Sequence, residues 1–234
     1  MEYDLTQVKC IGKVPMTQYP SPNALFYVNK ESAATGDNVI AYNDNEEYGI
    51  VTGDFSLTVG YDYTPRGKEM RASNLPKLHI NQEPNQWYLL TAPFDCTVPD
   101  GIIAREIISH KQTSTGINNA TANVNVLVGG KTYLVMTSST ERQTLAFHCG
   151  EGTEPQTKTF SCFVMPNTDT AVKGTFTTTA VPTGAKTIKY KEADKQYFMT
   201  AEDGEVCEAM RGYFFDENMP SSTTDFRAYS NMTL

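Results

Sequence analysis

Short runs in which apolar and polar residues alternate extend along the whole chain, and residues that favour turns separate them. No segment repeats its apolar residues at a period of about 3.6 positions over the length of an ordinary helix. The nearest exception, residues 102–111, is rich in β-branched residues, which favour a strand over a helix. The pattern therefore predicts an all-β protein made of many short strands.

In the first third of the chain the predicted strands are residues 25–28, 38–42, 48–52 and 56–59. Turn-forming residues at 36–37, 43–45 and 53–54 separate them. This regular spacing fits a small β-meander or the capping end of a solenoid.

The rest of the chain predicts a larger antiparallel domain. Its expected strands are residues 77–81, 87–92, 102–109, 123–128, 132–137, 143–148, 157–165, 171–179, 187–190, 196–200, 209–215 and 226–230. Gly129 and Gly130 stand between two apolar runs, which predicts a hairpin there. Many short antiparallel strands favour a β-sandwich or a jelly-roll-like domain.

These strands divide the chain into three predicted parts. Residues 1–20 form an extended attachment arm, because Pro15 and Pro20 hold the residues before them in extended backbone. Residues 21–76 form the small β region, and residues 77–234 form the sandwich-like domain. The arm residues expected to contact a partner are Tyr3, Leu5, Val8, Val14 and Tyr19.

Composition supports a folded β protein and argues against nucleic-acid binding. The 234 residues include 30 Thr, 13 Tyr and 11 Phe, residue types that suit a pleated sheet. The formal net charge of -8, with no basic cluster, is unsuited to a phosphate backbone. No apolar run reaches the roughly 18 residues of a membrane span. The first residues do not resemble a signal peptide, so we expect synthesis without export by the general route.

The five cysteines, at positions 10, 96, 149, 162 and 207, show no zinc-binding spacing. Their number is odd, so at least one thiol is free. Several lie in apolar runs, where a reduced cysteine behaves as a small hydrophobic residue. We therefore expect buried thiols and not a disulfide framework.

Several side chains are candidates for catalysis, and each is better explained by a structural role. His148 and Cys149 are neighbours in a predicted strand, so their side chains point to opposite faces. Asp95 and Glu106 offer the two carboxylates that glycoside hydrolysis requires. We expect Asp95 to cap a turn through a local Asx bond and Glu106 to pair with Arg105 or a lysine. No catalytic residue is assigned.

Cofactor and metal candidates are equally weak. Residues 129–132 read Gly-Gly-Lys-Thr, but Asn125 replaces the first glycine of a phosphate-binding loop and a strand follows. Residues 36–38 and 43–47 are rich in oxygen ligands, yet their spacing does not match a calcium loop. Solvated turns explain them better, and we expect no cofactor and no metal.

Among the aromatic residues, Trp87 is expected to anchor the core at the start of a strand. Tyr61 and Tyr63 would share one face of a strand and are the candidates for a surface contact.

The segment from Trp87 to Asp95, with the motif Trp-x-x-Leu-x-x-Pro-Phe-Asp, resembles a β-rich module found at the C-terminal ends of secreted and surface proteins of Bacteroidetes. The resemblance extends to residues 22–28, 36–40, 129–135, 211–215 and 226–229. It covers roughly residues 20–234, through several motifs in the right order. It implies a structural or adhesive role without catalysis.

An adhesive module without a leader predicts a virion-surface subunit of a phage that infects Bacteroidetes, as a capsid decoration, head fibre or tail fibre. The alternative is a secreted or cell-surface adhesion module of such a bacterium, and the second alternative is a carbohydrate-active enzyme. Expected partners are capsid or tail proteins, a host surface glycan or protein, and further copies of the chain in a homo-oligomer.

Overall fold

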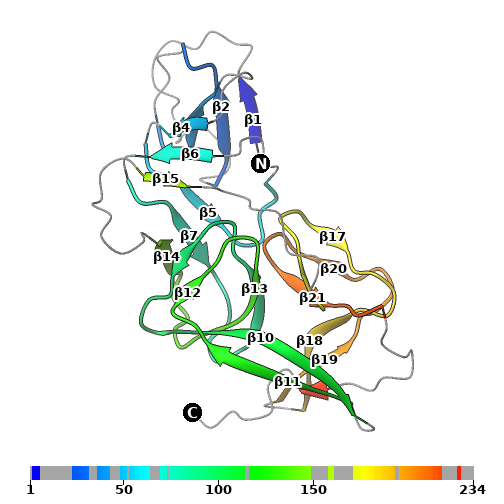
Figure 1. Ribbon diagram of the computed structural model, residues 1–234. Helices are drawn as coiled ribbons and strands as arrows, with labels where there is room; N and C mark the ends of the chain where they lie inside the picture. The colour runs from blue at the N-terminus through cyan, green and yellow to red at the C-terminus, as the bar shows by residue number, and fades with distance from the viewer. Residues whose placement is uncertain are drawn as a thin grey trace.

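The computed structural model describes residues 2–5, 23–31, 36–42, 48–51, 53–63, 69–72, 74–113, 116–148, 158–160, 171–192, 195–217 and 226–227. All regular elements in these ranges are β-strands, which confirms the predicted all-β class (Figure 1). Several antiparallel sheets are present, consistent with a β-sandwich, whereas the jelly-roll order is not confirmed. Within the described ranges, no helix is long and apolar enough to cross a membrane.

The N-terminal sheet has the strand order β1-β2-β3-β4-β6-β15. Its strands are β1 (Glu2–Leu5), β2 (Leu25–Val28), β3 (Val39–Ala41), β4 (Tyr48–Val51), β6 (Glu69–Ala72) and β15 (Lys158–Phe160). β1, β2 and β3 pair in parallel, as do β4 and β6. Consecutive strands of a meander pair antiparallel, so this region is not a simple meander.

Two sheets form the middle of the molecule. The central sheet is ordered β12-β9-β14-β7-β5, and the hairpin sheet is ordered β11-β10-β13-β8. The central strands are β5 (Ser56–Thr58), β7 (Lys77–Ile80), β9 (Cys96–Thr97), β12 (Val126–Leu127) and β14 (Gln143–Phe147). The hairpin sheet contains β8 (Tyr88–Thr91), β10 (Ile102–Thr113), β11 (Gly116–Asn123) and β13 (Thr132–Thr137). The long β10–β11 hairpin lies at the end of the molecule opposite the N-terminal sheet (Figure 1).

The C-terminal sheet is ordered β16-β21-β18-β19-β22, and β17 pairs with β20 beside it. Its strands are β16 (Val172–Gly174), β18 (Lys186–Glu192), β19 (Lys195–Thr200), β21 (Gly212–Phe214) and β22 (Phe226–Arg227). The small two-stranded sheet is made of β17 (Thr179–Ala180) and β20 (Val206–Cys207).

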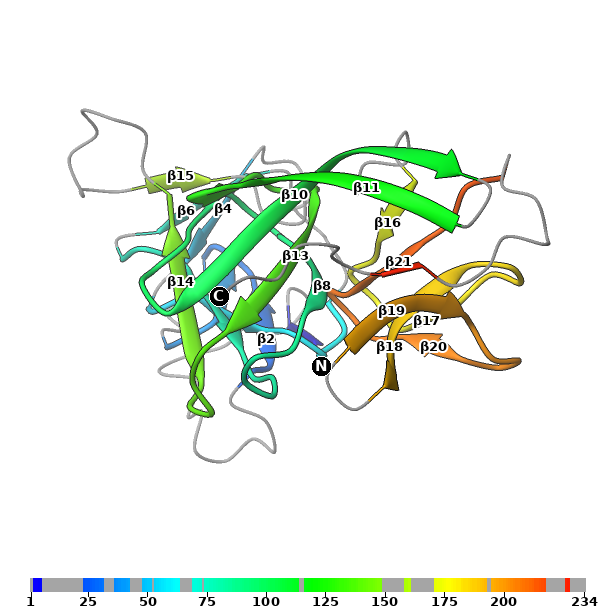
Figure 2. The same ribbon diagram turned by 90° about the horizontal axis from the view of Figure 1, so that it is seen from below.

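Strands β8 and β13 are buried on both faces, because they lie between the central and C-terminal sheets (Figure 2). On one face, the cross-strand pair Leu90 and Tyr133 belongs to the core shared with the central and N-terminal sheets. On the other face, the pair Leu89 and Leu134 packs with Phe198 and other residues of the C-terminal sheet. Burial on both faces explains why these strands have nearly continuous apolar sequences.

A single core crosses the predicted boundary between the small β region and the larger domain. Leu25 and Ile40 of the N-terminal sheet belong to the same buried cluster as Leu78 and Leu145 of the central sheet. β5 pairs with β7, and β15 pairs with β6, so strand pairing also joins the two sides. The shared core and the strand pairing therefore continue across this boundary.

The start of the predicted attachment arm is part of the fold, and this is a correction. β1 pairs in parallel with β2, and the Tyr3 ring stacks on Phe26 with centroids 5.0 Å apart. Tyr3 and Leu5 pack against the buried cluster that contains Phe26 and Val39. These two side chains are used inside the chain because they cover an apolar sheet face. Val8, Val14 and Tyr19 lie outside the described residues.

The predicted hairpin at Gly129 and Gly130 is wrong in its pairing, although a turn is present. The Lys131 N–H donates to the Val128 carbonyl at 3.1 Å, and Gly130 has a φ of 81°. β12, before the turn, pairs with β9, while β13, after it, pairs with β8 and β10. The turn therefore transfers the chain from the central sheet to the hairpin sheet.

The expectations for Trp87 and for the described cysteines are confirmed. Trp87 is 2% exposed and packs in the cluster between the hairpin and C-terminal sheets. Cys96 and Cys207 are buried free thiols. Burial is the main reason that the pKa of each thiol is raised, to about 12 for Cys207, so both remain protonated near neutral pH. Cys10, Cys149 and Cys162 lie outside the described residues.

Two side-chain amides join neighbouring sheets. Each amide binds the backbone N–H and the backbone C=O of a single residue in the other sheet or next to it. The Trp87 N–H donates to Gln196 Oε1 at 2.6 Å, and Gln196 Nε2 donates to the Trp87 carbonyl at 3.0 Å. Asn38 binds the N–H and C=O of Ser56 in the same way, at 2.7 and 3.0 Å. Each amide takes the place of a missing strand partner, which satisfies backbone groups between sheets.

Gln196→Ala is expected to destabilise the protein by about 2 kcal/mol, because it removes two hydrogen bonds to the Trp87 backbone beside a buried side chain. The matched control is Gln143→Ala, since the Gln143 amide bonds the Glu141 carbonyl at an exposed site. The control should change stability by less than about 0.5 kcal/mol. Urea denaturation measures both, and equal effects would contradict the bridging role of Gln196.

Candidate functional site

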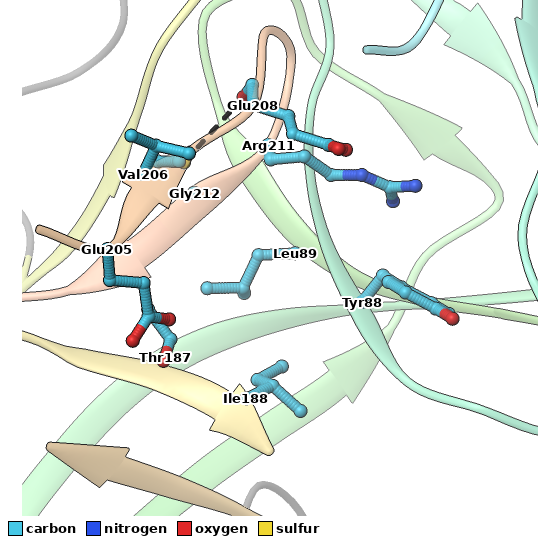
Figure 3. A pocket seen from close by; sticks show the side chains of 10 residues that line it. Tyr88, Leu89, Thr187, Ile188, Glu205, Val206, Glu208, Arg211 and Gly212 are labelled. Carbon is cyan, nitrogen blue, oxygen red and sulfur yellow. Dashed lines mark hydrogen bonds between the residues drawn. The ribbon is translucent and has the colours of Figure 1, made fainter. Parts of the chain in front are cut away.

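A cavity of about 310 Å³ opens where β8, β18 and the segment from β20 to β21 meet (Figure 3). Its apolar side chains come from β8, β18 and β20, and its charged ones come from the loop between β20 and β21 and from Glu205, which precedes β20. The residues that line it are Tyr88, Leu89, Thr187, Ile188, Glu205, Val206, Cys207, Glu208, Arg211 and Gly212.

The loop between β20 and β21 is fixed by backbone bonds to the rest of the molecule. The Arg211 N–H donates to the Glu208 carbonyl at 3.1 Å, which closes a tight turn. The Thr91 N–H donates to the Met210 carbonyl at 2.9 Å, so the loop covers the outer edge of β8. The Met210 side chain is buried. The loop therefore holds Glu208 and Arg211 in place at the cavity.

Arg211 is the main cation of the cavity. Its guanidinium carbon lies 4.7 Å from the centre of the Tyr88 ring, in a cation–π contact. Its Nη1 donates to Gln82 Oε1 at 3.4 Å, a long hydrogen bond. Burial lowers the pKa of Arg211, while the nearby Glu208 carboxylate opposes that shift. The guanidinium forms no ion pair with any carboxylate of the described residues, so it retains hydrogen-bond donors for a ligand.

The opposite side of the cavity carries a carboxylate that is already paired. Lys189 Nζ lies 2.7 Å from Glu205 and 3.1 Å from Glu202. Burial raises the pKa of Glu205, but bonds from Lys189 and the Glu202 N–H, together with the nearby Thr187 hydroxyl, outweigh burial, so the net pKa is lowered. Glu205 is therefore ionised near neutral pH and accepts hydrogen bonds.

The Thr187 hydroxyl is a buried polar group without a hydrogen bond of normal geometry to the described residues. It lies close enough to Glu205 to help lower the pKa of that carboxyl. A buried hydroxyl without a well-formed bond is costly, and such a group often indicates a ligand or water at the site. Cys207 also lines the cavity, but its raised pKa of about 12 makes it a poor nucleophile.

Of the two aromatic residues predicted to share a contact surface, one is buried and the other is exposed. Tyr63 is completely buried, and its hydroxyl oxygen accepts the Thr58 N–H at 3.3 Å, so its part of the prediction is wrong. The two residues follow a turn and do not lie in a strand, which removes the expected alternation. Tyr61 is 44% exposed. It follows Gly60, whose N–H donates to the Ala209 carbonyl at 3.0 Å, close to the loop of Glu208 and Arg211.

The carboxylates considered for glycoside hydrolysis are engaged in structural contacts. Asp95 Oδ1 accepts the Gly129 N–H at 2.8 Å, so Asp95 bonds a turn 34 positions away and not, as expected, a turn of its own segment. Glu106 pairs with Lys131 at 3.3 Å, as one of the two alternatives predicted. His148 Nδ1 lies 3.1 Å from Thr97 Oγ1, and Cys149 lies outside the described residues.

In the oxygen-rich segment considered for calcium, Asp37 accepts the Asp54 N–H at 3.1 Å, and Asn38 is bonded to Ser56. Residues 43–47 lie outside the described part of the chain. Among the described residues, no group of three or more His, Cys, Asp or Glu side chains is arranged to hold a metal.

Sequence reasoning did not find the cavity, because its residues come from three separate segments. Arg211 and Gly212 were predicted as part of a strand and of the resembling motif at 211–215, and Tyr88 as part of a strand and of the Trp87 motif, but none of them was assigned to a site. The signal available in the sequence was a charged residue at every third position, Glu205, Glu208 and Arg211, with small or apolar residues between them. That pattern is common on exposed turns and has no specificity by itself.

Comparison with known proteins does not identify a relative. No protein-family model matches the chain, and no curated protein or solved structure is significantly similar to it.

The stability of the fold should depend on pH through His79. Burial, together with Arg142 and Lys77, lowers the pKa of His79 from 6.5 to about 4. The unfolded chain therefore binds more protons between these pH values, so stability falls as the pH drops from 6.5 to about 4.

The measurement is urea denaturation at several pH values of the wild type and of His79→Gln. The wild type should lose on the order of 1 kcal/mol more than the variant, a discounted figure because His79 is partly exposed. Parallel stability curves for the two proteins would show that His79 does not titrate in this way.

Proposed function

We propose that this protein is a non-catalytic structural and adhesive subunit on the virion surface of a phage that infects Bacteroidetes. It acts through the shape and chemistry of its surface. The sequence motif from Trp87 to Asp95 and the extended β architecture support this proposal.

One observation carries the proposal: the side chains that could have been catalytic form structural contacts instead. Asp95 bonds the distant turn at Gly129, Glu106 pairs with Lys131, and the His79 ring bonds Thr144 Oγ1 at 2.8 Å. The Cys96 thiol is buried, and its raised pKa disfavours a thiolate. Groups held in this way stabilise sheets and turns, as the scaffold of a rigid surface protein requires.

The hairpin sheet also offers an edge for assembly. β11 is the outer strand of that sheet, and among the described strands only β10 pairs with it. From Gln112 to Gly130 the sequence contains no charged residue and no proline, the features that usually protect an edge strand. Ala122 and Asn123 near the end of β11 are exposed. This edge supports a homo-oligomer formed by strand pairing.

A second candidate is an adhesion module on the surface of a Bacteroidetes cell. The resemblance of the segment from Trp87 to Asp95 to modules of bacterial surface proteins favours it, and the cavity beside Arg211 suits a surface module of either origin. The carbohydrate-active enzyme receives no support from Asp95 and Glu106, because both carboxylates are engaged elsewhere.

The wild type is expected to form a closed oligomer, measured by light scattering with reductant present. Ala122→Lys should convert it to a monomer, because strand pairing would bury the added charge. The control is Thr140→Lys, which adds the same charge at an exposed turn and should leave the oligomer intact. Thermal unfolding checks that both variants fold. A monomeric wild type would contradict the virion-subunit proposal and favour the bacterial module.

A further inference from the structure

We propose that the cavity beside Arg211 binds a neutral saccharide. This inference rests on the adhesive function proposed above, and it names the class of ligand on the host surface. The argument comes from the polar groups, the net charge and the apolar wall of the cavity.

The polar groups present both kinds of hydrogen-bonding partner. Arg211 can only donate hydrogen bonds, whereas the carboxylates of Glu205 and Glu208 can only accept them. A ligand that satisfies all three must accept from one side and donate to the other. Each hydroxyl of a sugar does both, so a ring with several hydroxyls bridges the two sides. Figure 3 shows Arg211 and Glu208 extending from the same loop, with Glu205 and Thr187 together at another part of the wall.

The local charge disfavours an ionic ligand. Arg211 and Lys189 carry two positive charges, against the three negative charges of Glu202, Glu205 and Glu208. Lys189 is already held by Glu202 and Glu205, so it is not available to bind an anion. A carboxylate or sulfate group would lie near Glu208, and an ammonium group would lie near Arg211. An uncharged ligand avoids both repulsions.

The remaining wall is apolar and fits the C–H faces of a sugar ring. Leu89, Ile188 and Val206 provide it, and Val206 is 56% exposed at the rim. The volume of about 310 Å³ is at the lower end of the range of small-ligand pockets, roughly 300–1,000 Å³. The cavity therefore suits a single sugar ring of a longer glycan.

Thr187 provides an independent indication of a polar ligand. Its buried hydroxyl has no hydrogen bond of normal geometry to the described residues, and it lines the cavity. A sugar hydroxyl at this point would supply the missing bond. If the hydroxyl served only the fold, Thr187→Val would be destabilising, whereas a binding role predicts unchanged or higher stability with weaker binding.

The test uses the full chain on an array of neutral oligosaccharides with their sialylated and sulfated counterparts. The neutral oligosaccharide that gives the strongest signal is then titrated by calorimetry. Glu208→Gln removes a charged acceptor at an exposed position, so it should fold normally and bind about tenfold more weakly or worse. Glu141→Gln is the matched control, because it makes the same change at an exposed carboxylate that does not line the cavity, and it should bind like the wild type. Arg211→Met and Thr187→Val should also weaken binding.

Preferential binding of the neutral oligosaccharides, lost in Glu208→Gln and kept in Glu141→Gln, supports the inference. Preference for sialylated or sulfated glycans, binding to no glycan, or equal affinities of the wild type and all cavity variants would overturn it.

A parallel assay on intact Bacteroidetes cells separates this inference from the proposed function. Cell binding that survives periodate oxidation of surface glycans would contradict the saccharide site and leave the adhesive function standing. A protein that neither oligomerises nor binds cells would contradict the proposed function, whatever calorimetry reports for the free sugar.

Discussion

The burial of β8 and β13 on both faces is the constraint on which the rest of the structure depends. Leu90 and Tyr133 face one core, and Leu89 and Leu134 face the other, so each strand must be apolar at successive positions. A shift of one residue in register would exchange the two sets between cores of different shape. The pair therefore fixes the central sheet on one side and the C-terminal sheet on the other.

Close contact between these layers requires particular residues at their joins. A side chain at Gly174 of β16 would collide with the hydroxyl oxygens of Thr91 and Thr132, so only glycine allows this approach. The amide of Gln196 then satisfies the backbone of Trp87 where β8 has not yet begun. The sheets pack tightly near these points. The cavity lies between the ends of β8 and β18, where the loop carrying Glu208 and Arg211 completes its wall.

Much of the fold could be predicted because its signals are local. Alternation and turn residues located β2 and β13 at their observed bounds, and the lone Trp87 was correctly placed in the core. Pairing was harder, since the turn at Gly129 and Gly130 has the local chemistry of a hairpin but connects two sheets. Tyr63 was misplaced because alternation applies only inside a strand. Gln196 and Trp87 are 109 positions apart, so no local pattern could show their contact.

The candidate site could not be predicted for the same reason, because residues distant in the sequence form it. Arg211 is an ordinary charged residue in the sequence, and its environment becomes unusual only when β8 brings Tyr88 beneath the guanidinium. Burial lowers the pKa of Arg211, yet no carboxylate of the described residues pairs with it, while Lys189 holds two. A fold selected for stability alone would gain by pairing a largely buried cation or by replacing it with an apolar residue. Retaining an incompletely bonded guanidinium at a cavity wall is a cost that a bound ligand offsets, and this links the packing of the layers to recognition at the surface.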